Sequence, residues 1–151
     1  MRRKDREQSR EFALEVVDTC PYAVLATVNA DGTPYCVPVT IVREDDNIYF
    51  HGAQAGQKIE NLTSRPQVSL ACVSRSITRQ QAYSVDYAAA IVTGVAGLVT
   101  EKEEKAHALR ILCERHTPDA MEGVEKYISS AIGHTAVVRI AIRSITGKAN
   151  T

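Results

Sequence analysis

The residues with the clearest chemical potential lie in one segment, His51-Gly52-Ala53-Gln54-Ala55-Gly56-Gln57-Lys58. Its glycines permit a backbone to approach a ligand closely, and Lys58 adds a full positive charge. Because the segment should leave a strand and enter a helix, free backbone N–H groups would point toward the same place. The segment therefore predicts phosphate binding, and the alternative is a glycine-containing turn followed by a surface lysine. Residue 59 is Ile, which excludes a nucleotide-triphosphate P-loop.

His51 is the candidate catalytic residue, because it follows Tyr49 and Phe50 at an expected strand end and an imidazole forms hydrogen bonds near neutral pH. The alternative is a structural histidine. The other histidines, His107, His116 and His134, are expected to be solvated. No Ser/His/Asp arrangement, HExxH motif or carboxylate pair indicates hydrolytic or acid–base chemistry.

The cysteines indicate neither a metal site nor a disulfide framework, since they lack a CxxC pair and a histidine at zinc-ligand spacing. They are expected to act as small apolar residues, with Cys36 the one that could be reactive, and they stand at Cys20, Cys36, Cys72 and Cys113. The sequence therefore predicts no metal centre.

The elements that must position these groups are read from hydrophobic periodicity and turn residues. Helices are expected at Ser9–Cys20, 55–65, after a capping box formed by Thr100 and Glu103, and from Asp119 to Gly133. Strands are expected at 22–29, 33–43, 48–51, 67–73, 83–100 (one bent strand or two) and 135–145. Asp31-Gly32 favours a tight hairpin between the first two strands.

This order of elements is typical of an α+β fold and not of a βαβ repeat. About six antiparallel strands would remove their exposed edges by closing into a small barrel with peripheral helices. The chain has 151 residues and is expected to form one domain, residues 1–151.

Its 18 basic and 18 acidic residues give no net field for nucleic acid or an anionic membrane. No apolar stretch suits a membrane span or a secretory signal, so a cytoplasmic location is expected.

An ordered series of motifs resembles the pyridoxamine 5′-phosphate oxidase-like split-barrel flavoproteins. The resemblance covers about residues 12 to 148, and its motifs are Ala23–Val28, Asp31-Gly32-Thr33-Pro34-Tyr35, Pro38-Val39, Ile48–Ala53, Lys58, Asn61-Leu62 and Pro66–Leu70. His51-Gly52-Ala53 and the ending Ser144–Lys148 are most similar to the nitroimidazole-resistance branch.

The resemblance implies a homodimer that holds FMN at the subunit interface. By position, the flavin ring would lie along Pro38, Val39, Thr40 and Ile41, where strand backbone can hydrogen-bond the polar flavin edge. The phosphate would meet His51, Gly52, Gln57 and Lys58. Three departures argue against pyridoxamine-phosphate oxidation itself: Gln57 replaces the arginine of an Arg-Lys pair, Val42 replaces a basic residue, and no Arg/His-containing tail follows.

The first functional hypothesis is an FMN-dependent reductase of small electron-poor organic molecules such as nitroimidazoles, with His51 touching substrate or flavin. A second hypothesis is a flavin-binding module that senses or stores FMN without turnover. A third is a split barrel that uses another cofactor, such as a deazaflavin or haem.

Overall fold

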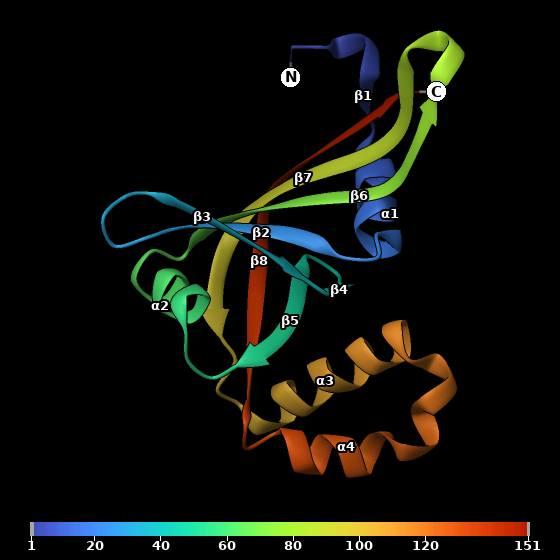
Figure 1. Cartoon of the computed structure of the whole chain (residues 1–151). Helices are drawn as coiled ribbons and strands as arrows, with labels where there is room; N and C mark the ends of the chain where they lie inside the picture. The colour runs from blue at the N-terminus through green and yellow to red at the C-terminus, as the bar shows by residue number, and fades with distance from the viewer. Residues whose placement is uncertain (1, 151) are drawn as a thin grey trace.

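An antiparallel sheet is the framework of the chain, whose computed structural model describes residues 2–150 (Figure 1). The strands are β1 (Glu7–Gln8), β2 (Ala23–Val28), β3 (Pro34–Val39), β4 (Val42–Glu44), β5 (Asn47–Ala53), β6 (Gln67–Arg79), β7 (Ser84–Leu98) and β8 (Thr135–Asn150). They run in the spatial order β3-β2-β6-β7-β8-β5-β4, and β1 pairs with β8. No ladder between described residues joins β3 to β4, so the barrel is split rather than closed. The expected α+β split barrel is confirmed, with six strands of six residues or more.

Helices pack at the periphery of the sheet. The α-helices are α1 (Arg10–Thr19), α2 (Gln57–Ser64), α3 (Lys102–His116) and α4 (Val124–Ala131), and the 3₁₀ helices are η1 (Lys4–Arg6), η2 (Gln80–Ala82) and η3 (Pro118–Gly123). Helix α1 begins where the Ser9 hydroxyl accepts a hydrogen bond from the Phe12 N–H at 3.2 Å. Figure 1 shows α3 and α4 as a pair at one end of the molecule, away from α1.

The buried apolar side chains form two separate cores along the sheet. The larger core fills the barrel beneath α1 and includes Leu25, Phe50, Leu70 and Ile140, which are completely buried. The smaller core lies between the sheet and the pair α3 and α4, and includes Leu109, Leu112, Val124 and Ile128. The β5 strand serves both cores, because successive side chains of a strand point to opposite faces.

Three local expectations were wrong. The strand expected over 33–43 is divided, because β3 pairs with β2, β4 pairs with β5, and residues 40 and 41 join neither ladder. The capping box at Thr100 does not form: α3 starts after Glu101, and no side chain caps it. The Val99 N–H still bonds the Val137 carbonyl at 2.9 Å, which holds this stretch in the sheet. The helix expected from Asp119 begins as the 3₁₀ helix η3 and becomes α-helical only at Val124.

The strands β6 and β8 extend beyond their expected ends, to Arg79 and Asn150, and β7 is one long strand. Among the cysteines, Cys20 and Cys72 are buried in the barrel core, as expected of small apolar residues, whereas Cys36 is exposed and Cys113 is half-buried. No helix between residues 2 and 150 is both long and apolar enough to cross a membrane.

Candidate functional site

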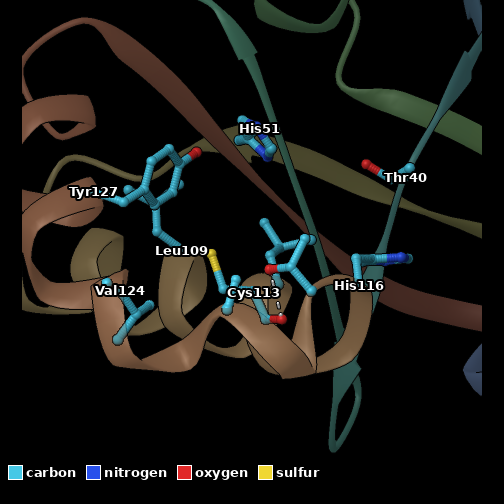
Figure 2. Close-up of a pocket in the computed structure, with 11 residues that line it drawn as sticks. Thr40, His51, Leu109, Cys113, His116, Val124 and Tyr127 are labelled. Atoms are coloured by element: carbon cyan, nitrogen blue, oxygen red, sulfur yellow. Dashed lines mark hydrogen bonds between the residues drawn. The ribbon is translucent and has the colours of Figure 1, made fainter.

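A cavity of about 500 Å³ lies between the sheet and the α3–η3–α4 segment (Figure 2). We call it the hairpin cavity, after the helical hairpin that α3 and α4 form. Its lining residues are Thr40 and His51 from the sheet side, and Leu109, Leu112, Cys113, His116, Thr117, Ala120, Gly123, Val124 and Tyr127 from the helical side. Most of this wall is apolar, so the polar atoms that reach it can orient a ligand.

His51 is the polar residue that lines the cavity from β5. It sits near the end of β5, opposite Val137 of β8, and its Nδ1 atom is buried without a hydrogen-bond partner among the described residues. Burial lowers the pKa of His51, and the positive charges of Lys58 and His116 lower it further. The imidazole is therefore neutral at pH 7 and can donate or accept one hydrogen bond at each nitrogen according to its tautomer.

The expectation that His116 is solvated was wrong. His116 ends α3, lines the hairpin cavity, and lies with Nε2 at 2.8 Å from the carbonyl oxygen of Ile41. Because a carbonyl can only accept, Nε2 carries the proton. This bond ties the end of α3 to the break between β3 and β4. His107 and His134 are exposed, as expected, and His107 contacts the Glu44 carboxylate at 2.9 Å.

A second polar location is the β5–α2 junction, residues 52–58. The Nζ atom of Lys58 lies 3.1 Å from the position that a Cβ atom on Gly52 would occupy, so glycine leaves room for the ammonium group. Lys58 is half-buried, lies 5.9 Å from the centre of the Phe50 ring, and forms no ion pair within residues 2–150. Gly56 precedes α2 with φ +120°, and no side chain caps the helix. The junction thus combines an unpaired cation with a free helix start, which suits an anion.

Gln57 forms a side-chain hydrogen bond that helps to position α2, and one N–H of its side-chain amide stays available. Its Nε2 donates to Asn29 Oδ1 at 2.8 Å, and Asn61 Nδ2 donates to the same oxygen at 2.8 Å. Asn61, buried on α2, also donates to Thr27 Oγ1 at 3.0 Å. This network fixes α2 against β2. The sequence signal for this network was the position of Asn61 beside Leu62, on the apolar face of the helix.

The four residues expected along the flavin ring alternate in orientation. Val39 and Ile41 are buried in the barrel core, whereas Pro38 and Thr40 are exposed. Only Thr40 reaches the hairpin cavity. The structure therefore brings Thr40 and His51 together at the cavity, and Gly52 and Lys58 together at the junction, with His51 between the two places.

The cavity residues from the helical pair were missed by sequence reasoning. Figure 2 shows Tyr127 and Cys113 reaching the cavity from the helical side while His51 faces it from the sheet. Tyr127 and Cys113 are not on the most buried stripes of their helices, and nothing local in the sequence shows which residues two packed helices leave around a hollow.

Comparison with known families matches residues 9–149 to the family described as pyridoxamine 5'-phosphate oxidase. The chain belongs to this family. No curated protein matches it significantly.

Solved structures with the same fold include three informative neighbours. A candidate 5-nitroimidazole antibiotic resistance protein from Bacteroides thetaiotaomicron is 24% identical, with 94% of this chain and 84% of that chain covered and a TM-score of 0.80. The flavocytochrome Anf3 from Azotobacter vinelandii is 22% identical, with 100% and 72% covered and a TM-score of 0.82. The FAD and heme binding protein from Mycobacterium smegmatis is 20% identical, with 96% and 73% covered and a TM-score of 0.78. At these identities the likeness concerns the fold.

Proposed function

We propose that this protein binds FMN and works as a reductase of small electron-poor organic molecules, nitroimidazoles included. The observation that carries the proposal is the unpaired Lys58 ammonium at the uncapped start of α2, next to a histidine with a free buried nitrogen. Bound flavin would supply the electrons, and the protein would supply anchorage, orientation and a sheltered place for the substrate.

The phosphate of FMN would lie at the β5–α2 junction. There, Lys58 offers a charge-assisted contact and Gly52 keeps the strand exit open. Gln57, an expected phosphate ligand, would offer the second N–H of its side-chain amide, because the first is bonded to Asn29 and holds α2 in place. A single lysine forms fewer hydrogen bonds to a phosphate than a lysine beside an arginine, whose guanidinium group binds two oxygens at once. The affinity for FMN would therefore be lower than with an Arg-Lys pair.

The flavin ring would run along residues 38–41, where the interruption between β3 and β4 leaves strand edges without a partner ladder in the described chain. Thr40 is exposed at this interruption and would reach the ring. Val39 and Ile41 face the barrel core, so their contribution would come from the backbone. His51 would touch the substrate or the flavin from β5.

A homodimer with FMN at the interface is part of the proposal. The register aligns Pro38, Val24, Ala71 and Ile91 in one row across β3, β2, β6 and β7, on the sheet face opposite the barrel core. Ile91 is 47% exposed and Val73, on the same face, is 45% exposed. An apolar face of this kind next to Pro38 suits a second copy that would cover both the sheet and the flavin.

The proposal is tested first by the absorbance of freshly purified protein and then by turnover. We expect bound flavin, and we expect a nitroimidazole to reoxidise the reduced flavin faster than oxygen does. Equal rates with and without the nitroimidazole would leave a flavin-binding module without reductase activity. A Soret band in place of flavin absorbance would contradict the proposal in favour of haem.

A further inference from the structure

We propose that Cys20 and Cys72 form a reversible disulfide when the protein meets hydrogen peroxide, so that the barrel core contains a thiol oxidation site. The site lies where the end of α1 meets β6. Bridge formation needs neither flavin nor the hairpin cavity, and neither cysteine lines that cavity.

The two thiols meet inside the barrel. Cys20 is the residue that ends α1, and Cys72 lies on β6 directly opposite Ala23 of β2. Because Ala23 follows Cys20 by only three residues, the turn from α1 into β2 brings Cys20 beside Cys72, and the two thiols hydrogen-bond each other. Both belong to the barrel core, where Cys20 is 2% exposed and Cys72 is fully buried. A neighbouring thiol is what converts an oxidised cysteine into a disulfide.

Arg115 of α3 places a positive charge beside Cys20. Its Nη2 atom donates to the carbonyl oxygens of Val17 and Cys20, at 2.9 and 2.8 Å, and lies 3.9 Å from the Cys20 sulfur. Its other terminal nitrogen, Nη1, is buried without a hydrogen-bond partner among the described residues. A cation that two carbonyl groups hold in place stabilises a thiolate more than a thiol.

Cys20 is the thiol that ionises first. The hydrogen bond from Cys72 and the charge of Arg115 outweigh burial and lower the pKa of Cys20 to about 7. The same hydrogen bond, together with burial, raises the pKa of Cys72. Because the thiolate is the nucleophilic form of cysteine, Cys20 would attack the oxidant, and Cys72 would stay protonated until it attacks Cys20.

The oxidant has a short route to the Cys20 sulfur. The next two residues, Pro21 and Tyr22, are exposed, and the side chain of Arg115 is only half-buried. A rotation of the Arg115 side chain, or a brief opening of the exposed turn, admits a molecule as small as hydrogen peroxide. Cys72 lies deeper, but it never has to meet the oxidant, because it reacts only with Cys20.

The reaction has two steps. The Cys20 thiolate attacks one oxygen of hydrogen peroxide and the O–O bond breaks, which leaves a sulfenic acid on Cys20 and releases hydroxide that takes up a proton to become water. The Cys72 thiol then attacks the Cys20 sulfur, the S–O bond breaks, and the thiol proton leaves with the hydroxide as a second water. The two thiols lose two electrons and the peroxide gains them. A thiol reductant reverses the bridge.

The bridge is tested in Cys36→Ser, because Cys36 is exposed and would react with peroxide by itself. In the reduced, unfolded variant, iodoacetamide alkylates the three remaining cysteines. After brief treatment of the folded protein with hydrogen peroxide, we expect only Cys113 to be alkylated, and the mass spectrum to contain a peptide pair joined through Cys20 and Cys72. Dithiothreitol should restore all three sites. Full alkylation after peroxide, a bridge to Cys113, or oxygen added to Cys20 without a bridge would overturn the proposal.

The order of attack is tested with one substitution at each cysteine. Without the second thiol, Cys72→Ala should accumulate the sulfenic acid on Cys20, where dimedone labels it. Cys20→Ala should leave Cys72 unlabelled. Labelling of Cys72 in Cys20→Ala would contradict the assignment of Cys20 as the attacking thiol. The bridge itself is established by peptide mapping of Cys36→Ser, in which the core is unchanged.

The contribution of Arg115 is measured from the pH dependence of the rate. The groups whose charge acts on Cys20 are Cys72 from β6 and Arg115 from α3. Bridge formation should accelerate with pH and level off above about pH 7, as Cys20 ionises. Arg115→Gln should move this midpoint to higher pH and slow the reaction at pH 7 about threefold or more, whereas Arg115→Lys keeps the charge and should keep the lower midpoint. An unchanged midpoint in Arg115→Gln would contradict the role of Arg115.

Discussion

The two cores of the molecule use the same kinds of apolar side chain with different results. The barrel core beneath α1 is closed: Leu25, Phe50, Leu70 and Ile140 have no exposed surface. The layer between the sheet and the α3–η3–α4 segment is looser, with Val124 at 9% exposure and a cavity of about 500 Å³. His51 lines that cavity, and its Nδ1 atom is buried without a hydrogen-bond partner among the described residues.

This difference indicates that the barrel contributes more to stability and that the helical layer leaves space for a ligand. Closely packed cores tolerate little change in volume, whereas an apolar hollow of this size is typical of small-molecule pockets. The β5 strand connects the two regions, since Phe50 fills the barrel core and the next residue, His51, faces the cavity.

The largest expected contrast is between two leucines. Leu70→Ala in the barrel core should lower the free energy of unfolding by about 4 kcal/mol, because the rigid surroundings cannot fill the space. Leu112→Ala should cost about 2 kcal/mol, because Leu112 already borders a cavity and loses fewer contacts. Urea denaturation of both variants measures the contrast. Equal losses would mean that the helical layer is packed as tightly as the barrel.

A second contrast compares two glycines of β7. A Cβ atom on Gly94 would lie 2.5 Å from the carbonyl oxygen of Ala141 in β8, whereas a Cβ atom on Gly97 would meet nothing within 4 Å. Gly94→Ala should therefore cost about 2–3 kcal/mol, because two paired strands must separate. Gly97→Ala should stay within about 0.5 kcal/mol of the unsubstituted protein. A similar stability for the two variants in thermal or urea unfolding would show that the β7–β8 pairing is more pliable than its geometry implies.

The smallest expected effect is on the pH dependence of stability. The pKa of His51 is lower in the folded protein than its ordinary value of 6.5, mainly because of burial. The unfolded chain therefore binds more protons near that pH, and the contribution of His51 to stability is lost as pH falls from above 6.5 through the folded pKa. The free energy of unfolding, measured at pH 7.5 and 5.5, should fall by less in His51→Gln than in the unsubstituted protein. An identical fall would show that His51 is not desolvated.

Local signals were sufficient to predict much of the framework from sequence. Ser9 caps α1 as its residue type suggests. At the β2–β3 turn, Gly32 adopts φ +88°, and the Asn29 N–H donates to the Thr33 carbonyl at 2.8 Å. Such turns and caps depend on neighbours within a few residues, so a single sequence contains the information.

The remainder depends on contacts between distant parts of the chain. The break between β3 and β4 is held by His116, which lies 75 residues after Ile41. The start of α3 is displaced from Thr100 because Val99 still pairs with Val137 of the last strand. The junction of Gly52 and Lys58 was predictable as a motif, but the cavity beside it arises only when α3 and α4 pack on the sheet, so Tyr127 and Cys113 had no local signal.

The central claim is that Lys58 anchors the phosphate of FMN, and the most direct test compares FMN with riboflavin, which lacks the phosphate. Lys58→Ala should weaken FMN binding about ten- to hundredfold, because one charge-assisted contact is lost, and should leave riboflavin binding unchanged. Lys126→Ala, on the exposed face of α4, is the control and should change neither affinity. Titration of both flavins into the three proteins decides the matter: equal losses for FMN and riboflavin, or an unchanged FMN affinity, would contradict the account.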